Sequence, residues 1–256
     1  MPDSTIFALG GAGGDAQPDS HLEKALSSFF PSGTWANTRG NATTSGDSED
    51  NLSNAENTGV HNLEDVGRGT SNTRQIDRSF FAFDLSGESD TVASADLKIV
   101  TDNLGDTDTN SSTVFVVSAT DLSSNTGDYG NVFSSGQTLG TTFGSTTIST
   151  TEQYHTWTLN SDAISRINTL IGSGGIFTIG LMGYYDYNNS GPGSSELKIK
   201  VLYANQAGTS NDPKLELTFE SAASGYSHKV LGVAAGSIGK VNGVATANIG
   251  KVNSVD

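Results

Sequence analysis

Residues 78–86 read Arg-Ser-Phe-Phe-Ala-Phe-Asp-Leu-Ser, and this stretch decides the fold of the chain. Phe81, Phe83 and Leu85 recur at every second position, which is the period of a β-strand with one buried face. The preceding 40 or so residues show no such period. The pattern therefore predicts that the regular sheet structure begins with a strand at Arg78.

Six later segments carry the same signal. They are residues 95–99, 114–117, 157–159, 177–181, 197–203 and 215–219. Residues 114–117 are continuously apolar, which is typical of a strand covered on both faces. Clusters of Gly, Asn, Asp and Ser separate the seven segments, as turns separate short strands. The sequence predicts an all-β protein, a β-sandwich with one or two short helices.

One helix is expected between two of these strands. Ile164, Ile167 and Leu170 are apolar at helical spacing, Asn160 or Ser161 can cap the first turn, and Gly172 can end the last one. A helix over residues 161–171 is therefore predicted.

The region before Arg78 has a different composition. Residues 1–18 form a Gly-rich arm, and a second short helix is expected to follow a cap at Asp19 or Ser20, because Leu22, Ala25, Leu26 and Phe29 are apolar at helical spacing. Residues 35–74 are polar and rich in turn formers. They predict a long surface loop or a segment held by a partner, with one short strand near Leu63 and Val66.

The ordered motifs of the sandwich resemble a known family, the DNRLRE jelly-roll domain, which is related to carbohydrate-binding modules. The motifs are Arg78-Ser79-Phe80-Phe81-Ala82-Phe83-Asp84-Leu85-Ser86, Ser94-Ala95-Asp96-Leu97, the Trp157 strand with its helix, the strand at 175–181, Ser194-Ser195-Glu196 and Pro213-Lys214-Leu215-Glu216-Leu217. The resemblance covers residues 63–220 and implies a jelly roll. The long segment before Arg78 and a Tyr-rich insertion before Ser194 depart from the pattern, so the family's ligand sites are not carried over.

The C-terminal residues contain one short sequence motif three times. Copies begin at Lys229, Lys240 and Lys251, so the repeat is 11 residues long. A repeat so short and rich in Gly, Ala and Val must stack on itself, pair with another chain or stay disordered. Asn242-Gly243 is a strong signal for a two-residue hairpin turn. The repeat resembles the C-terminal ends of tailed-bacteriophage structural proteins, which implies a virion component.

We expect this tail to be an assembly anchor, rather than a flexible end. Each repeat would supply a short strand that either coils into a small stack or adds to the sheet edge of a neighbouring subunit. The residues expected to carry it are Lys229, Val230, Val233, Ile238, Lys240, Val241, Val244, Ile249, Lys251, Val252 and Val255. The chain then has four parts: the arm (1–18), a helix and polar loop (19–77), the sandwich (78–220) and the tail (225–256).

Composition limits the function. The net charge is −15; residues 225–256 carry three lysines and one aspartate, or +2, so the remainder carries −17. An acidic body repels phosphate backbones, which argues against nucleic-acid binding. No run of about 20 apolar residues predicts a membrane span, and no secretion signal is visible at the start. With no cysteine, neither a disulfide framework nor a thiolate zinc site is expected.

Two clusters are candidate binding sites. The first is an expected loop that could bind a sugar, because it combines aromatic faces that stack on the ring with amide and carboxylate groups that bond its hydroxyls. Its residues are Tyr184, Tyr185, Asp186, Tyr187 and Asn188. The alternative is that the tyrosines pack into the sandwich. Oxygen ligands for calcium are offered by Asp102, Asp106, Asp108 and Asn110, although Ser111 and Val117 stand where an EF-hand needs Gly and Glu. A solvated acidic turn is the alternative there.

No constellation for catalysis is apparent. The four histidines stand in unlike contexts, and no nucleophile elbow, zinc-binding helix or phosphate loop occurs. No cofactor is expected other than the calcium considered above. We expect a non-enzymatic structural protein of a phage virion, with other virion proteins and copies of itself as partners. The alternatives are an adhesin that recognises host polysaccharide and a secreted bacterial cell-surface protein.

Overall fold

The computed structural model describes residues 2–9, 20–28, 35–40, 48–50, 57–66, 72–106, 112–120, 126–133, 138–149, 153–193, 196–202, 212–220, 240–241 and 244–245. The chain forms two compact units, residues 1–218 and 219–256. The first unit is built almost entirely of antiparallel strands, so the predicted all-β class is confirmed.

The first unit contains twelve described strands. They are β1 (Ser4–Phe7), β2 (Ser20–Ser28), β3 (Ser48–Asp50), β4 (Asn57–Val66), β5 (Asn72–Asp84), β6 (Val92–Asp106), β7 (Thr113–Ser118), β8 (Thr142–Thr147), β9 (Gln153–Thr158), β10 (Ile176–Gly183), β11 (Glu196–Leu202) and β12 (Lys214–Phe219). Four helical segments join them: α1 (Trp35–Arg39), the 3-10 helix η1 (Thr126–Val132), α2 (Ser161–Ile171) and α3 (Tyr184–Asn188).

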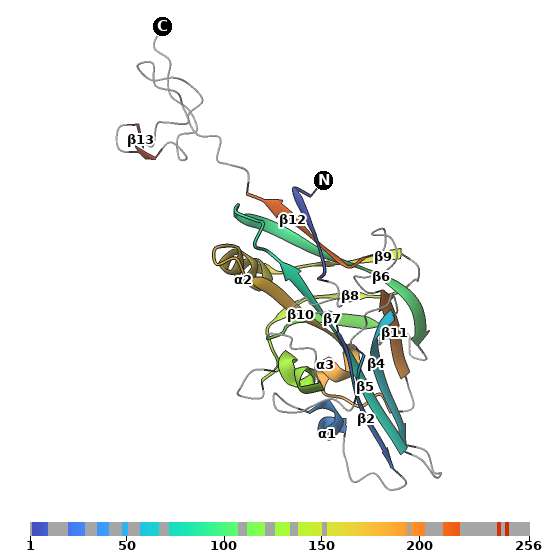
Figure 1. Ribbon diagram of the computed structural model, residues 1–256. Helices are drawn as coiled ribbons and strands as arrows, with labels where there is room; N and C mark the ends of the chain where they lie inside the picture. The colour runs from blue at the N-terminus through green and yellow to red at the C-terminus, as the bar shows by residue number, and fades with distance from the viewer. Residues whose placement is uncertain are drawn as a thin grey trace. The chain divides into compact units, whose positions relative to one another are not determined.

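The strands follow the order β1-β12-β6-β11-β4-β5-β10-β7-β8, with β2 and β3 branching from β5 and β9 pairing with β6. The long strands β5 and β6 each change partner midway. Residues 72–77 of β5 pair with β4 and residues 79–84 with β10, while β6 pairs first with β9 and then with β11 (Figure 1). These two strands belong to both halves of the sandwich and join them into one hydrogen-bonded system.

The core lies between the layers. Trp157 of β9 is buried, and its indole Nε1 donates a hydrogen bond of 2.9 Å to the carbonyl oxygen of Val114 in β7. The rings of Phe143 and Phe177 stack with centroids 5.5 Å apart. In β5 the residues from Ile76 to Phe83 are all buried, so this strand is covered on both faces.

All seven predicted strand segments are confirmed as strands. The predicted helix is confirmed as α2, with Asn160 as its N-cap and Gly172 as its C-cap. The Asn160 side chain accepts hydrogen bonds from the backbone N–H groups of Asp162 and Ala163, which satisfies two unpaired donors of the first turn. The jelly-roll connectivity stays a prediction.

The helix expected after Asp19 is wrong. Residues 20–28 form β2, which pairs with β5 from Ser20 opposite Phe80 to Ser28 opposite Asn72. The apolar spacing of Leu22, Ala25 and Leu26 is compatible with a helix. A nine-residue ladder with a buried strand overrides that local preference, because most of the stability of a short element comes from tertiary pairing.

The long polar loop expected at 35–74 is also wrong, although the short strand expected near Leu63 and Val66 is confirmed as part of β4. This region contains α1, β3 and the ten-residue strand β4, and β5 begins at Asn72 rather than at Arg78. Strand β4 pairs with β11 on one side and β5 on the other. A strand hydrogen-bonded on both sides satisfies its backbone groups even where its side chains are polar, as with the buried Asn62.

The second unit contains the strands β13 (Lys240–Val241) and β14 (Val244–Ala245). They pair antiparallel, with Lys240 opposite Ala245 and Val241 opposite Val244. Asn242 and Gly243, where a two-residue hairpin turn is expected, lie between these strands and outside the described residues.

Candidate functional site

The Tyr-rich segment after β10 is a helical turn rather than the expected loop. Residues 184–188 form α3, and Asn189 ends it in the left-handed conformation (φ 52°). The Asn189 N–H donates to the Asp186 carbonyl and the Ser190 N–H to that of Tyr185. Asparagine tolerates this conformation better than most residues, which makes it a suitable helix end. The turn directs Tyr185 and Asp186 inward and leaves Tyr184 and Asn188 exposed.

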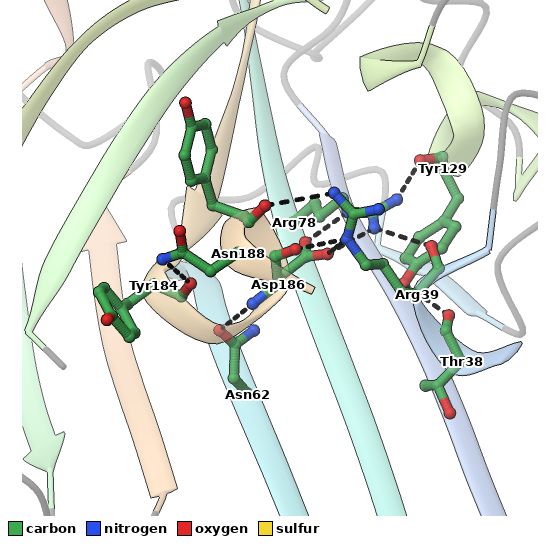
Figure 2. Close-up of polar contacts among 9 residues, drawn as sticks. Thr38, Arg39, Asn62, Arg78, Tyr129, Tyr184, Asp186 and Asn188 are labelled. Carbon is green, nitrogen blue, oxygen red and sulfur yellow. Dashed lines mark hydrogen bonds and ion pairs between the residues drawn. The ribbon is translucent and has the colours of Figure 1, made fainter. Parts of the chain in front are cut away.

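Asp186 and Arg78 form a fully buried ion pair with two parallel hydrogen bonds. Arg78 Nε donates to Asp186 Oδ2 at 2.7 Å and Arg78 Nη2 to Asp186 Oδ1 at 2.8 Å (Figure 2). Both side chains have 0% exposure. This is the bidentate geometry that a guanidinium and a carboxylate prefer, and it gives each buried charge a partner of opposite sign.

The remaining donors of Arg78 reach backbone oxygens of two other segments. Nη1 donates to the carbonyl of Tyr129 in η1 at 2.7 Å, and Nη2 donates to that of Arg39 in α1 at 2.9 Å. The guanidinium carbon lies 4.0 Å from the centre of the Tyr129 ring. One side chain on β5 thus connects α1, η1 and α3, three segments distant in sequence.

Arg39 also lies near this carboxylate. Its Nε donates to the Asp186 carbonyl oxygen, its Nη2 donates to that of Tyr187 at 3.3 Å, and Nε lies 3.5 Å from Asp186 Oδ1. The side chain is 13% exposed. We call Arg39, Arg78, Tyr129 and Asp186 the arginine clamp.

The environment of the clamp fixes its protonation. Burial opposes the charge of Arg78, but Asp186 outweighs burial and raises the pKa of Arg78. Burial lowers the pKa of Arg39. Burial also raises the pKa of Tyr129, which therefore stays a neutral phenol and donates its O–H to the Thr38 carbonyl at 3.1 Å. All of these groups are engaged with the protein itself, so the clamp can hold segments together but offers no free acid or base.

The residues expected to bind a sugar are divided by the fold. Tyr185 and Asp186 are buried, and the carboxylate of Asp186 is paired with Arg78. The ring of Tyr187 stacks on Phe115 at 3.7 Å, and its hydroxyl shares a hydrogen bond of 2.8 Å with Thr142. Only Tyr184, 37% exposed and in edge contact with Tyr185, and the exposed Asn188 remain available to solvent.

Two of the four residues expected to bind calcium lie in a described strand. Asp102 and Asp106 lie in β6, while Asp108 and Asn110 lie outside the described residues. In the described part of the chain, no group of three or more His, Asp or Glu residues is placed to hold a metal ion.

Few of the assembly residues lie in described strands. Lys240, Val241 and Val244 lie in the β13–β14 hairpin. The others lie outside the described residues: Lys229, Val230, Val233, Ile238, Ile249, Lys251, Val252 and Val255.

The described helices are all too short or too polar to cross a membrane. No family model matches the chain, and no curated protein matches it.

Sequence reasoning missed the arginine clamp. Arg39 and Tyr129 lie in turn-rich segments without periodicity, and their partner Asp186 is far from them in the chain. One signal was present: Arg78 directly precedes a run of residues that are all buried. A charged residue at such a position needs a buried partner of opposite charge.

Proposed function

We propose that this protein is a non-enzymatic structural component of a phage virion, which assembles through its C-terminal repeat. The observation that carries the proposal is the β13–β14 hairpin in the central copy of the repeat, where Val241 lies opposite Val244. The other partners would be further virion proteins and copies of the same chain.

The size of the hairpin supports this role. Each strand has two residues, and a two-stranded hairpin in water is at best marginally stable. A hairpin of this size gains stability when a further strand edge pairs with it. A strand edge on a neighbouring subunit supplies both backbone partners and apolar contact.

Charge supports the choice of partner. The tail carries +2 and the rest of the chain −17, from the sequence. Attraction between unlike charges steers the tail of one copy towards the body of another and weakens as salt is added. The lysines recur at the repeat spacing, so each copy of the repeat brings one positive charge to the interface.

The clamp supports a mechanical rather than a catalytic role. Its charged groups form hydrogen bonds that hold α1, η1 and α3 to β5. A body fixed in this way is a rigid platform for terminal segments, and rigid scaffolds lower the entropy cost of assembly.

Point substitutions in the hairpin test the proposal. Val241→Asp with Val244→Asp should leave the sandwich folded but reduce incorporation into particles at least tenfold. Asn248→Asp with Asn253→Asp adds the same two charges to polar positions of the tail and should incorporate nearly normally. Equal incorporation of the two variants would refute the role of the hairpin.

A second candidate function is recognition of host polysaccharide by an adhesin. The observation that favours it is the exposure of Tyr184, whose backbone carbonyl is held by Asn188 Nδ2 at 2.9 Å. An exposed aromatic face beside an amide can stack on a sugar ring and bond its hydroxyls. Tyr184→Ala should abolish polysaccharide retention, whereas Phe7→Ala, which removes another exposed aromatic side chain, should not. Retention by both variants would exclude this site.

A further inference from the structure

Strand β1 ends the sheet and is attached on one side. Its four residues pair with β12, with Thr5 opposite Glu216 and Ile6 opposite Leu215. Beyond the strand, the Ala8 N–H donates to the Pro213 carbonyl at 2.9 Å and the Leu9 N–H to that of Ala82 at 2.8 Å. The N-terminal segment therefore closes an edge that β12 would otherwise expose.

Side chains contribute little to this attachment. Thr5 is exposed and Phe7 is 43% exposed, while Ser4 and Ile6 are half-buried. Among the strand's side chains, Ser4 donates a hydrogen bond of 2.7 Å from its Oγ to Glu88 Oε1. Most of the attachment is backbone pairing, which a strand of the same sequence from another copy makes equally well.

The acceptor strand needs a partner. Leu215 and Leu217 of β12 are fully buried, and β12 also pairs with β6. Without β1 its outer side would be a free sheet edge above the core, and free edges recruit strands from other chains.

The chain between β1 and β2 permits exchange. Residues 10–19 include four glycines, at 10, 11, 13 and 14, a composition typical of flexible linkers. Eleven peptide steps join Leu9 to Ser20, enough to span up to about 36 Å. The sequence thus gives Ser4–Phe7 the reach to leave its own β12 for that of an adjacent molecule.

We propose that β1 is an exchangeable strand: in crowded assemblies the Ser4–Phe7 segment of one copy pairs with β12 of a second copy. Strand exchange repeats the same contacts between chains and so costs little. Tethering through a linker of this length gives the internal strand an effective concentration of about millimolar, so exchange becomes favourable where copies are packed at similar density. The inference uses the proposed structural role only to explain where such density arises.

Cysteine crosslinking tests this directly, because the natural chain contains no cysteine. Thr5 and Glu216 are direct neighbours across the ladder, close enough for a disulfide. A Thr5→Cys chain and a Glu216→Cys chain are mixed at about millimolar concentration, oxidised, and analysed without reductant. As a control, the Thr5→Cys chain is mixed with a Ser165→Cys chain, whose cysteine lies at an exposed position of α2. This mixture measures how much disulfide forms by random collision.

The expected result is a heterodimer band at least five times the collision background, increasing with concentration and absent in dilute solution. The double variant, Thr5→Cys with Glu216→Cys, should form an intrachain disulfide when dilute. The proposal is overturned if the mixture yields no more heterodimer than the collision control while the double variant forms its intrachain disulfide. Failure of the double variant to close overturns it as well, because the β1–β12 register would be wrong. The experiment uses isolated protein without particles. A negative result therefore does not bear on the role of the C-terminal tail, which is tested separately.

Discussion

Arg78 and Asp186 lie 108 positions apart in the chain and meet as a bidentate ion pair with no exposed surface. The pair joins β5 to α3, and the same guanidinium holds the carbonyls of Arg39 and Tyr129. It therefore fixes the end of the sandwich at which three helical segments gather (Figure 1). The structure of this end depends on one buried charge and its partner.

The first prediction concerns that pair. Asp186→Asn keeps the shape of the side chain but leaves the buried Arg78 charge without its counter-ion, so the free energy of unfolding should fall by about 3–5 kcal/mol. Urea denaturation followed by far-UV circular dichroism measures the change. Asp90→Asn, at an exposed carboxylate, is the matched control and should change stability by about 0.5 kcal/mol or less.

A double-mutant cycle sharpens this prediction. Arg78→Met with Asp186→Leu removes both charges, so no unpaired ion remains in the core. The double variant should lose clearly less stability than the sum of the two single losses. Additive losses would show that the two side chains act independently, contrary to the geometry.

The second prediction concerns the contact between η1 and β10. A Cβ on Gly180 would lie 2.6 Å from Val132 Cγ1 and 3.3 Å from the Phe80 ring. Gly180→Ala should therefore lower the free energy of unfolding by about 1–3 kcal/mol through overpacking. Val132→Ala in the Gly180→Ala background should restore part of the loss, although alone it destabilises. No recovery in the double variant would mean that Val132 is not the obstacle.

The third prediction concerns pH. Burial alone would raise the pKa of Glu216, but hydrogen bonds from Lys98 and Lys214, with N–O distances of 2.7 and 3.1 Å, lower it below the ordinary 4.5. A carboxyl whose pKa is depressed by folding stabilises the protein above its unfolded pKa and loses that contribution as pH falls through its folded pKa. Wild type should therefore exceed Glu216→Gln in stability above pH 4.5, and the difference should shrink below it. Melting temperatures from pH 7 to pH 3 measure this; a difference that is constant with pH would contradict it.

The strands of the sandwich were predictable because their apolar positions recur with period two. The segments with Phe81, Phe177 and Leu215 are each buried at those positions. Helix α2 was predictable because its caps are local: Asn160 satisfies the first turn by itself. In both cases the sequence signal and the physical cause lie within about ten residues of each other.

The wrong predictions share the opposite property. Residues 20–28 are a strand because β5 lies beside them, and nothing within the segment indicates that partner. Strand β4 is polar, and its order comes from pairing with β5 and β11. The clamp likewise depends on residues from four elements. The tyrosines next to Asp186 in the sequence do not indicate that Asp186 pairs with Arg78.

The most direct test of the proposed assembly role is the number of copies per particle for a chain that ends at residue 224. The truncated chain should melt within about 2 °C of the full chain, because the sandwich lies in the separate first unit, yet be nearly absent from purified particles. Quantitative mass spectrometry of particles formed with either chain measures this. A truncated chain that is folded and present at the normal copy number would contradict the claim that the repeat tail attaches this protein to its assembly.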